Sequence, residues 1–309
     1  METRKIGSLD VSVVGLGCNN FGRRLDAAAT AQVVNACLDN GINFFDTADV
    51  YGAGMSEDYI GQALKASGRR DEAIIASKFG NVMEGVGHGA HPDYIKKAVE
   101  GSLKRLQTDT IDLYQLHIPD PTVPLADTLG ALNDLVQAGK VREIGSSNFS
   151  AQQIDEAEAA VKPGAARFLS VQNRYSILSR DPEQGVLAEC ERLGIGFLPY
   201  FPLESGLLTG KVQQGHAPEG TRLAESGTAA RFLTEHNVAL AEQLIQFAES
   251  QGHTILELAF GWLLAKPVVA SVIAGATKAE QVKANAGAAG WKLTEADLAA
   301  VESIVSQPA

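Results

Sequence analysis

The chain has 309 residues, of which 45% are hydrophobic and 20% are charged, and its formal net charge is −11. A chain this acidic lacks the basic face needed to bind nucleic acid or an anionic membrane non-specifically, although a local basic pocket for a phosphate remains compatible with it. The three cysteines form no CxxC pair, which argues against a disulfide framework or a zinc knuckle. We recognise neither a secretory leader nor an apolar run of the ~18 residues that a membrane helix needs, so we expect a cytoplasmic protein.

Short apolar segments alternate with longer segments of helical periodicity along the chain. A hairpin around Gly7 and Ser8 is expected first. Eight strands are then predicted at residues 11–17, 42–46, 73–78, 111–117, 141–146, 168–172, 196–200 and 268–275. Helices are predicted at residues 27–40, 57–66, 93–106, 125–138, 151–160, 182–193, 234–250 and 279–288. Eight buried strands, each followed by a helix, predict an α/β fold of the (β/α)8 TIM-barrel type with a parallel core, forming one domain over residues 1–309.

A doubly wound sheet is the alternative fold, and the segment "GLGCNNFG" at residues 15–22 bears on it. A dinucleotide fingerprint in the first turn would read GxGxxG, but Asn20 stands where the third glycine should be. We therefore interpret this segment as a strand end that another group approaches closely. The longest connection, residues 203–231, exceeds the ~12–15 residues of an ordinary loop, which is typical of a functional or mobile segment.

Polar side chains stand at the predicted ends of the strands. Asp46, Lys78 and His117 end the second, third and fourth strands, and Tyr51 follows Asp46 in the next loop. Each alone has an ordinary explanation as a turn residue, a helix cap or a solvated side chain. In a barrel, however, the carboxyl ends of all the strands meet at one mouth, where the chemistry of this fold takes place. Their convergence there favours a functional site.

These four residues suit the reduction of a carbonyl group. Tyrosine has an ordinary pKa of about 10, and a nearby ammonium stabilises the phenolate and lowers that pKa. Asp46 would hold Lys78 charged and in place as a buried ion pair, and His117 would orient or polarise a carbonyl oxygen. The set supplies a proton but no hydride, so a nicotinamide cofactor is required.

Seven ordered segments resemble the aldo-keto reductase family over essentially the whole chain. They are "GINFFDTADVYG", "ASKFG", "IDLYQLH", "GKVREIGSSNFS", "VQNRYSILSRDPE", "GIGFLPYFPLESGLLTGK" and "IAGATKAEQVKAN". The resemblance implies an NADPH-dependent oxidoreductase that reduces an aldehyde or ketone. It also implies that Tyr51 is the general acid/base, that Lys78 and Asp46 tune it, and that His117 orients the substrate. The Thr277 and Gln281 pair resembles the branch that includes potassium-channel β-subunits.

The resemblance also implies a set of cofactor contacts. Those expected at the first strand end and around the nicotinamide are Gly17, Cys18, Ser147, Asn148, Gln172 and Tyr200. Those expected along the pyrophosphate are Phe201, Pro202, Leu203, Gly206, Lys211 and Arg222. Those expected at the adenosine end are Gly275, Thr277, Lys278, Gln281 and Asn285. Thr277 and Lys278 start a predicted helix, and a helix N-terminus favours a phosphate, so we expect NADP (NADPH) in preference to NAD.

The substrate side and one histidine pair complete the candidate residues. Asn19 and Asn20 would make the pocket wall polar, which suits a sugar or hydroxyaldehyde; alternatively, they cap the loop backbone. His88 and His91 form an HxxH pattern, but a metal site needs more ligands, so we expect no metal. We interpret the nearby Asp93 as the N-cap of the helix that follows.

Three other functions remain open. One is an NAD-dependent sugar or alcohol dehydrogenase, and another is a nicotinamide-sensing regulatory subunit with slow turnover. The third is an aldolase that uses Lys78 as a Schiff-base nucleophile, which the paired Asp46 opposes because it keeps the lysine protonated. For the reductase we expect a small-molecule carbonyl substrate as the partner, and neither nucleic acid nor a membrane.

Overall fold

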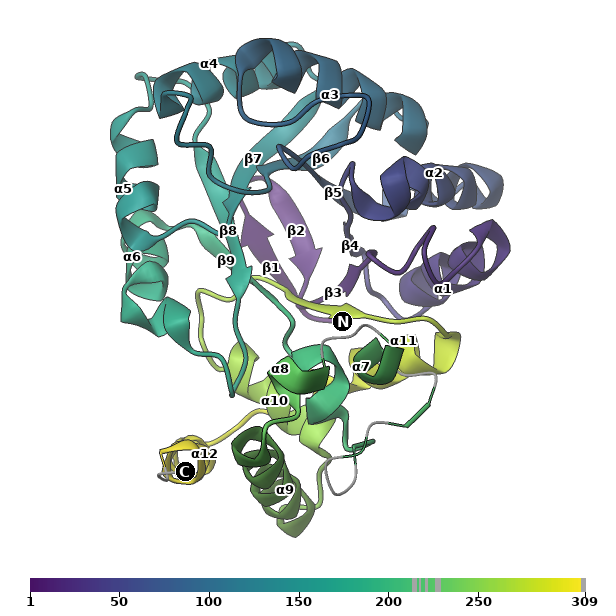
Figure 1. Ribbon diagram of the computed structural model, residues 1–309, viewed down its shortest axis with the longest axis vertical. Helices are drawn as coiled ribbons and strands as arrows, with labels where there is room; N and C mark the ends of the chain where they lie inside the picture. The colour runs from purple at the N-terminus through teal and green to yellow at the C-terminus, as the bar shows by residue number, and fades with distance from the viewer. Residues whose placement is uncertain (213–215, 217, 220–221, 226–228, 307–309) are drawn as a thin grey trace.

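Eight parallel strands close into a barrel in the computed structural model, which describes residues 1–306 except 213–215, 217, 220–221 and 226–228 (Figure 1). Around the barrel the strand order is β10, β3, β4, β5, β6, β7, β8, β9. The strands are β3 (Val14–Gly17), β4 (Phe44–Asp46), β5 (Ile74–Phe79), β6 (Ile111–Leu116), β7 (Val141–Ser147), β8 (Phe168–Arg174), β9 (Gly196–Tyr200) and β10 (Val272–Gly275). The predicted (β/α)8 barrel is confirmed.

Helices follow the strands around the outside of the barrel (Figure 1). They are α1 (Ala27–Asp39), α2 (Met55–Ser67), α3 (Pro92–Leu106), α4 (Leu125–Gln137), α5 (Ala151–Ala159), α6 (Val186–Leu193), α7 (Arg222–Glu225), α8 (Ala229–Phe232), α9 (Glu235–Ser250), α10 (Ile255–Leu264), α11 (Ala279–Ala288) and α12 (Glu295–Val305). Side-chain caps fix several starts; for example, Asp26 Oδ1 accepts a hydrogen bond from Ala29 N at 2.8 Å. No helix of the described residues is long and apolar enough to cross a membrane.

An antiparallel hairpin of β1 (Thr3–Ile6) and β2 (Leu9–Ser12) closes the amino end of the barrel. Its buried side chains Ile6, Leu9 and Val11 pack against interior barrel residues such as Phe44 and Leu198. The hairpin predicted around Gly7 is therefore present. The first barrel strand was predicted to begin at residue 11, which is wrong, because residues 11 and 12 pair within the hairpin.

Other sequence predictions need correction at the helices. The helix predicted over residues 182–193 is interrupted at Gly185, whose φ of 128° lies outside the helical region, and α6 begins only after it. Asp93 is not the N-cap of α3; His91 takes that position, and its Nδ1 accepts a hydrogen bond from Asp93 N at 3.3 Å. Helix α10, in which eight of ten residues are buried, and helix α12 were not predicted from the sequence.

The register of the strands brings the polar strand ends to one mouth. Gly17 pairs with Asp46 across β3 and β4, and Lys78 pairs with Gln115 across β5 and β6. Ser147 likewise pairs with Gln172. Because all eight strands are parallel, these side chains gather at the carboxyl end, opposite the hairpin.

Candidate active site

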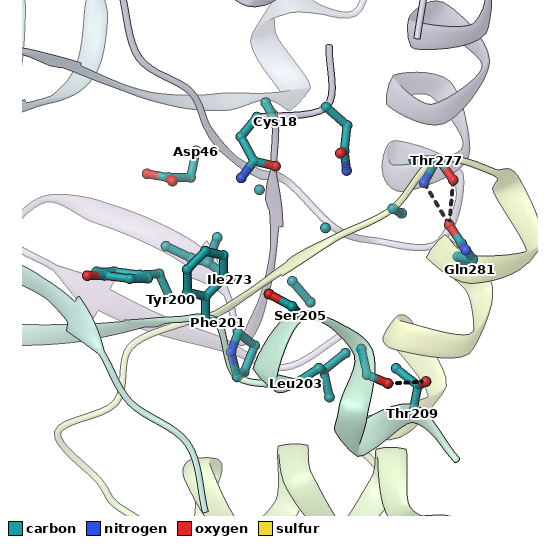
Figure 2. Close-up of a pocket in the computed structure, with 18 of the residues that line it drawn as sticks. Cys18, Asp46, Tyr200, Phe201, Leu203, Ser205, Thr209, Ile273, Thr277 and Gln281 are labelled. Atoms are coloured by element: carbon teal, nitrogen blue, oxygen red, sulfur yellow. Dashed lines mark hydrogen bonds between the residues drawn. The ribbon is translucent and has the colours of Figure 1, made fainter. Parts of the chain in front are cut away.

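A cavity of about 470 Å³ opens at the carboxyl ends of the strands. Figure 2 shows side chains from distant parts of the chain around it, including Cys18, Asp46, Tyr200, Ser205 and Gln281. The predicted residues that line it are Gly17, Cys18, Asn19, Asn20, Asp46, Tyr51, His117, Ser147, Asn148, Gln172, Tyr200, Phe201, Pro202, Leu203, Gly206, Lys211, Gly275, Thr277 and Gln281. One cavity therefore unites most of the catalytic and cofactor residues predicted from the sequence.

A buried ion pair lies beneath this cavity. Lys78 Nζ is 2.8 Å from Asp46 Oδ2 and also donates to the backbone oxygen of Thr47 at 2.8 Å. The side chains of Lys78 and Asp46 are 0% and 4% exposed, so water screens the pair little. Asp46 Oδ1 accepts from Gln172 Nε2 at 2.8 Å and, more weakly, from Gln115 Nε2 at 3.4 Å. The carboxylate is thus held by several donors, and it holds the ammonium in turn.

Tyr51 stands beside this ion pair on a tight turn, η1 (Tyr51–Gly54). Gly52 and Ala53 in that turn have positive φ values of 58° and 55°, so the backbone is held in the left-handed region. Lys78 Nζ lies 5.1 Å from the centre of the Tyr51 ring, and His117 meets that ring edge-on at a centroid distance of 5.8 Å. The four predicted catalytic residues therefore lie together.

The protonation states of these groups follow from burial and charge. Burial raises the pKa of Tyr51, and Lys78 offsets only part of this effect. The expected lowering of the tyrosine pKa is therefore wrong in its net direction. Burial alone would lower the pKa of Lys78, but Asp46 and Tyr51 outweigh it and raise that pKa, so the lysine is charged as expected. Burial, together with the Lys78 charge, lowers the pKa of His117 to about 3. At neutral pH the site has a protonated phenol, an ammonium and a neutral imidazole.

One side of the cavity carries amide and hydroxyl groups linked to Tyr200. The Tyr200 hydroxyl donates to Asn148 Oδ1 at 2.8 Å, and Asn148 Nδ2 donates to the backbone oxygen of His117 at 3.0 Å. Ser147 Oγ donates to the backbone oxygen of Gln172 at 2.8 Å. Asn148 is exposed, has a φ of 61° and lines the cavity. These groups can receive a planar amide-bearing ring.

The segment after β9 has a strained backbone and is held in place by the buried Glu204. Phe201, Glu204 and Ser205 all have positive φ values, at 53°, 46° and 57°. Glu204 is buried, accepts from Ser176 Oγ at 2.5 Å and pairs with Arg174. This anchor fixes the short helix η4 (Glu204–Thr209), whose Ser205 and Gly206 line the cavity. Such irregular backbone can present N–H groups to an anion.

The far end of the cavity is formed by the start of α11. Gln281 Oε1 accepts hydrogen bonds from Thr277 N at 2.7 Å and from Thr277 Oγ1 at 3.1 Å (Figure 2). Lys278 is the exposed N-cap of this helix, and Asn285 is buried within it; neither lines the cavity. The side chain of Arg222 lies outside the described residues. The structure thus brings Thr277 and Gln281, but not Lys278 or Asn285, to the cavity.

Comparison with known proteins agrees with this geometry. A model described as the aldo/keto reductase family matches residues 13–306. The chain belongs to the aldo/keto reductase family. It is 35% identical over 307 residues to the aldo-keto reductase YhdN of Bacillus subtilis (strain 168), which covers 96% of this chain and 91% of YhdN. The family and these relatives make the protein an NAD(P)H-dependent oxidoreductase.

Other relatives of this aldo/keto reductase carry different descriptions. It is 34% identical over 295 residues to a probable voltage-gated potassium channel subunit beta of Oryza sativa subsp. japonica, which covers 92% of this chain and 90% of the relative. Among solved structures, a glycerol dehydrogenase from Gluconobacter oxydans has a TM-score of 0.85 at 30% identity, covering 99% of this chain and 95% of its own. An aldo-keto reductase from Bacillus halodurans, in its holo form, has a TM-score of 0.80 at 32% identity, covering 98% and 96%.

Several residues that line the cavity of this aldo/keto reductase were not predicted from the sequence. They are Arg24, Ser205, Thr209, Val212, Pro218, Leu223, Ile273, Ala274 and Ala276. Ser205 could have been found from its place between Leu203 and Gly206. Arg24 has no comparable signal, because it reaches the cavity through a local turn in which its backbone N–H donates to the Asn20 oxygen at 2.8 Å.

Proposed function

We propose that this aldo/keto reductase uses NADPH to reduce the aldehyde or ketone group of a small hydroxylated compound, with Tyr51 as the proton donor. The observation that carries the proposal is the contact of Tyr51 with the buried Lys78–Asp46 pair and with His117 at the cavity wall. Nicotinamide, when bound, supplies the hydride for such a reduction.

The cavity offers groups that fit this cofactor. The half-buried ring of Tyr200 is suited to stack on a nicotinamide, and Ser147, Asn148 and Gln172 offer polar groups to its carboxamide. Ser205 and Lys211 would hold the pyrophosphate, because a backbone N–H group and an ammonium favour anionic oxygens, and Gly206 lines the same part of the cavity. Gly17, Cys18 and Gly275 leave room for the cofactor's close approach.

The protein's own part in the reaction is the transfer of one proton. Tyr51 would donate its hydroxyl proton to the carbonyl oxygen, and the charged Lys78 would stabilise the phenolate left behind. Asp46 keeps Lys78 protonated and holds it beside Tyr51. A neutral His117 still has one ring N–H, which can donate a hydrogen bond to the same carbonyl oxygen. Among the described residues its buried Nδ1 has no hydrogen-bond partner.

The preference for NADPH rests on the start of α11. Thr277 and Gln281 lie at a helix N-terminus, where the backbone favours a phosphate, and Lys278, the N-cap of that helix, adds positive charge. In the structure Gln281 occupies the Thr277 N–H, so a bound phosphate would replace this internal hydrogen bond.

We expect a fluorescence titration of the purified protein to show tighter binding of NADPH than of NADH. Gln281→Glu should remove this preference, because a carboxylate would repel the extra phosphate while preserving the hydrogen bond to Thr277. The matched control is Glu280→Gln, a charge change at an exposed neighbour. Tighter binding of NADH by the unaltered protein would contradict the NADPH assignment and would favour a dehydrogenase.

The substrate class rests on the polarity of the cavity wall. Asn19 and Asn20 both line the cavity, and Asn20 Nδ2 lies 3.4 Å from where a Cβ on Gly275 would be. A hydroxylated substrate can exchange hydrogen bonds with this polar wall, whereas an apolar one cannot. The structural similarity to a glycerol dehydrogenase supports a sugar or hydroxyaldehyde.

Asn20→Leu should therefore shift the ratio of kcat/KM values toward aromatic aldehydes and away from glyceraldehyde, by about 10-fold or more, because an unpaired polar group no longer penalises the apolar substrate. The Kd for NADPH is measured in parallel, because it reports whether Asn20 contacts the cofactor and not the substrate. If Asn20→Leu alters only that Kd and leaves the substrate ratio unchanged, Asn20 belongs to the cofactor side.

A further inference from the structure

A second group of buried ionisable residues lies behind the turn that carries Tyr51. It consists of the buried Asp49, Glu57, Tyr94 and Tyr114 and the partly exposed Arg105, and none of them lines the cavity. Asp49 and Glu57 are 1% and 0% exposed. None of these residues takes part in the proposed proton transfer. Two buried carboxyl groups next to the catalytic turn are nevertheless unusual, because burying a carboxylate is costly and such groups often have a function.

This group is tied directly to the catalytic residues. Asp49 lies two residues before Tyr51, and its backbone N–H donates to the backbone oxygen of Lys78 at 3.1 Å. Glu57 Oε1 accepts from the hydroxyl of Ser77, the neighbour of Lys78 on β5. A movement of Asp49 or Glu57 would therefore shift the backbone that carries Tyr51 and Lys78.

Arg105 completes the connection from the outer side. Its Nε donates to Glu57 Oε2 at 2.7 Å, and its Cδ lies 2.9 Å from where a Cβ on Gly54 would be. The guanidinium therefore packs against the last residue of the η1 turn while it neutralises Glu57. Among the described residues of this group, Arg105 is the one cation, and Glu57 already takes its Nε–H.

Asp49 lacks a matching partner for a charge. Among the described residues, neither of its oxygens makes a hydrogen bond, and the Tyr94 and Tyr114 hydroxyls also have no partner. Burial raises the pKa of Asp49 to about 7, and the Glu57 carboxylate adds to the rise, whereas Arg105, the Val50 N–H and Tyr94 oppose it. Tyr114 on β6 and Tyr94 on α3 stay protonated, because burial raises their pKa values too.

An ionised Asp49 would be a second negative charge in a buried space that already holds Glu57 and one arginine. A neutral Asp49 fits the observed arrangement, because no cation of the described residues pairs with it and the neighbouring Val50 N–H and Tyr94 hydroxyl make no hydrogen bond of normal length to its oxygens. Ionisation therefore favours a displacement of the backbone at Asp49 toward water or toward new donors.

We propose that Asp49 is a positioning residue that makes turnover pH-sensitive: its protonated form holds the Tyr51 turn against Lys78, and its ionised form displaces that turn. The inference rests on the proposed role of Tyr51 as proton donor. The sign follows from the chemistry of an acid, because Asp49 is neutral below its pKa and charged above it. Turnover is therefore highest on the acid side and falls as the pH rises through that value.

The test is the pH profile of kcat at saturating NADPH and glyceraldehyde, from about pH 6 to about pH 9, for the unaltered protein and two variants. The unaltered protein should lose about 10-fold in kcat across this pH range. This loss corresponds to a coupling of one pKa unit between the ionisation of Asp49 and turnover. Asp49→Asn, which stays neutral, should keep the acid-side kcat throughout. Asp93→Asn, at an exposed carboxylate on α3, should follow the unaltered protein.

An infrared measurement gives a second reading that does not depend on activity. The carbonyl band of a protonated carboxyl should disappear in the unaltered protein between about pH 6 and about pH 9 and should be missing in Asp49→Asn. If that variant does not fold, coincident midpoints of the band and of kcat in the unaltered protein decide for the proposal, and separate midpoints overturn it. An unchanged kcat profile in folded Asp49→Asn also overturns it. A Tyr51→Phe variant with normal turnover would instead refute the proposed function, whatever Asp49 does.

Discussion

Tyr51→Phe should lower kcat by about 10²- to 10⁴-fold, the range that a positioned general acid contributes. The phenol is the group of the cavity wall that Lys78 and His117 both face, and burial keeps it protonated. Phenylalanine preserves the ring and its packing, so the Kd for NADPH should stay within about twofold, because only a group used in the reaction step has been removed. Steady-state kinetics and a fluorescence titration on the same sample measure the two quantities.

The matched control for this variant is Tyr59→Phe. Tyr59 lies on α2, close to Tyr51 in sequence, and its hydroxyl contacts only the Met55 sulfur, at 3.7 Å, among the hydrogen bonds found for described residues. It should leave kcat unchanged. Near-normal turnover in Tyr51→Phe would show that a different group donates the proton.

Lys78→Met should abolish measurable turnover and also lower the free energy of unfolding by about 3–5 kcal/mol. Methionine fills much of the space of the lysine stem but leaves the buried Asp46 carboxylate without its cation. The remaining hydrogen bonds from Gln172 and Gln115 do not neutralise that charge. Denaturant unfolding followed by fluorescence measures the loss of stability, and single-turnover kinetics measures the loss of activity.

Two further variants separate charge burial from catalysis. Asp46→Asn combined with Lys78→Met should recover most of the stability, since no unpaired charge stays buried, but should remain inactive. Lys140→Met removes a lysine from an exposed ion pair with Glu100 and should cost less than about 1 kcal/mol. Full activity in the double variant would mean that Lys78 and Asp46 serve the fold alone.

The barrel was predictable because its strands and helices differ in period and repeat eight times. What failed were elements without that contrast. Helix α10 is buried at eight of its ten residues, so its sequence, "ILELAFGWLL", shows no broad polar face. Its capping box of Thr254 and Glu257 was the signal that could have revealed it, and Thr294 with Asp297 marks α12 in the same way.

The catalytic residues were predictable for a related reason. Asp46, Lys78 and His117 each stand at the carboxyl end of a strand, and parallel pairing brings such ends together. The net shift of the Tyr51 pKa was not predictable, because it depends on how deeply the ring is buried, which the sequence does not state. The group around Asp49 was not predicted either. Its arginine, Arg105, lies on α3, 48 positions after Glu57, and nothing in the sequence indicates that the two residues meet.

Following the transferred hydrogen shows whether this protein reduces a carbonyl group with NADPH. The protein is incubated with NADPH that carries deuterium at the reactive C4 position and with glyceraldehyde, and the alcohol is analysed by mass spectrometry. We expect one deuterium at the former carbonyl carbon of each product molecule, and none when Tyr51→Phe replaces the unaltered protein for the same time. An alcohol without deuterium, or no alcohol despite bound NADPH, would contradict the assignment of this chain as a carbonyl reductase.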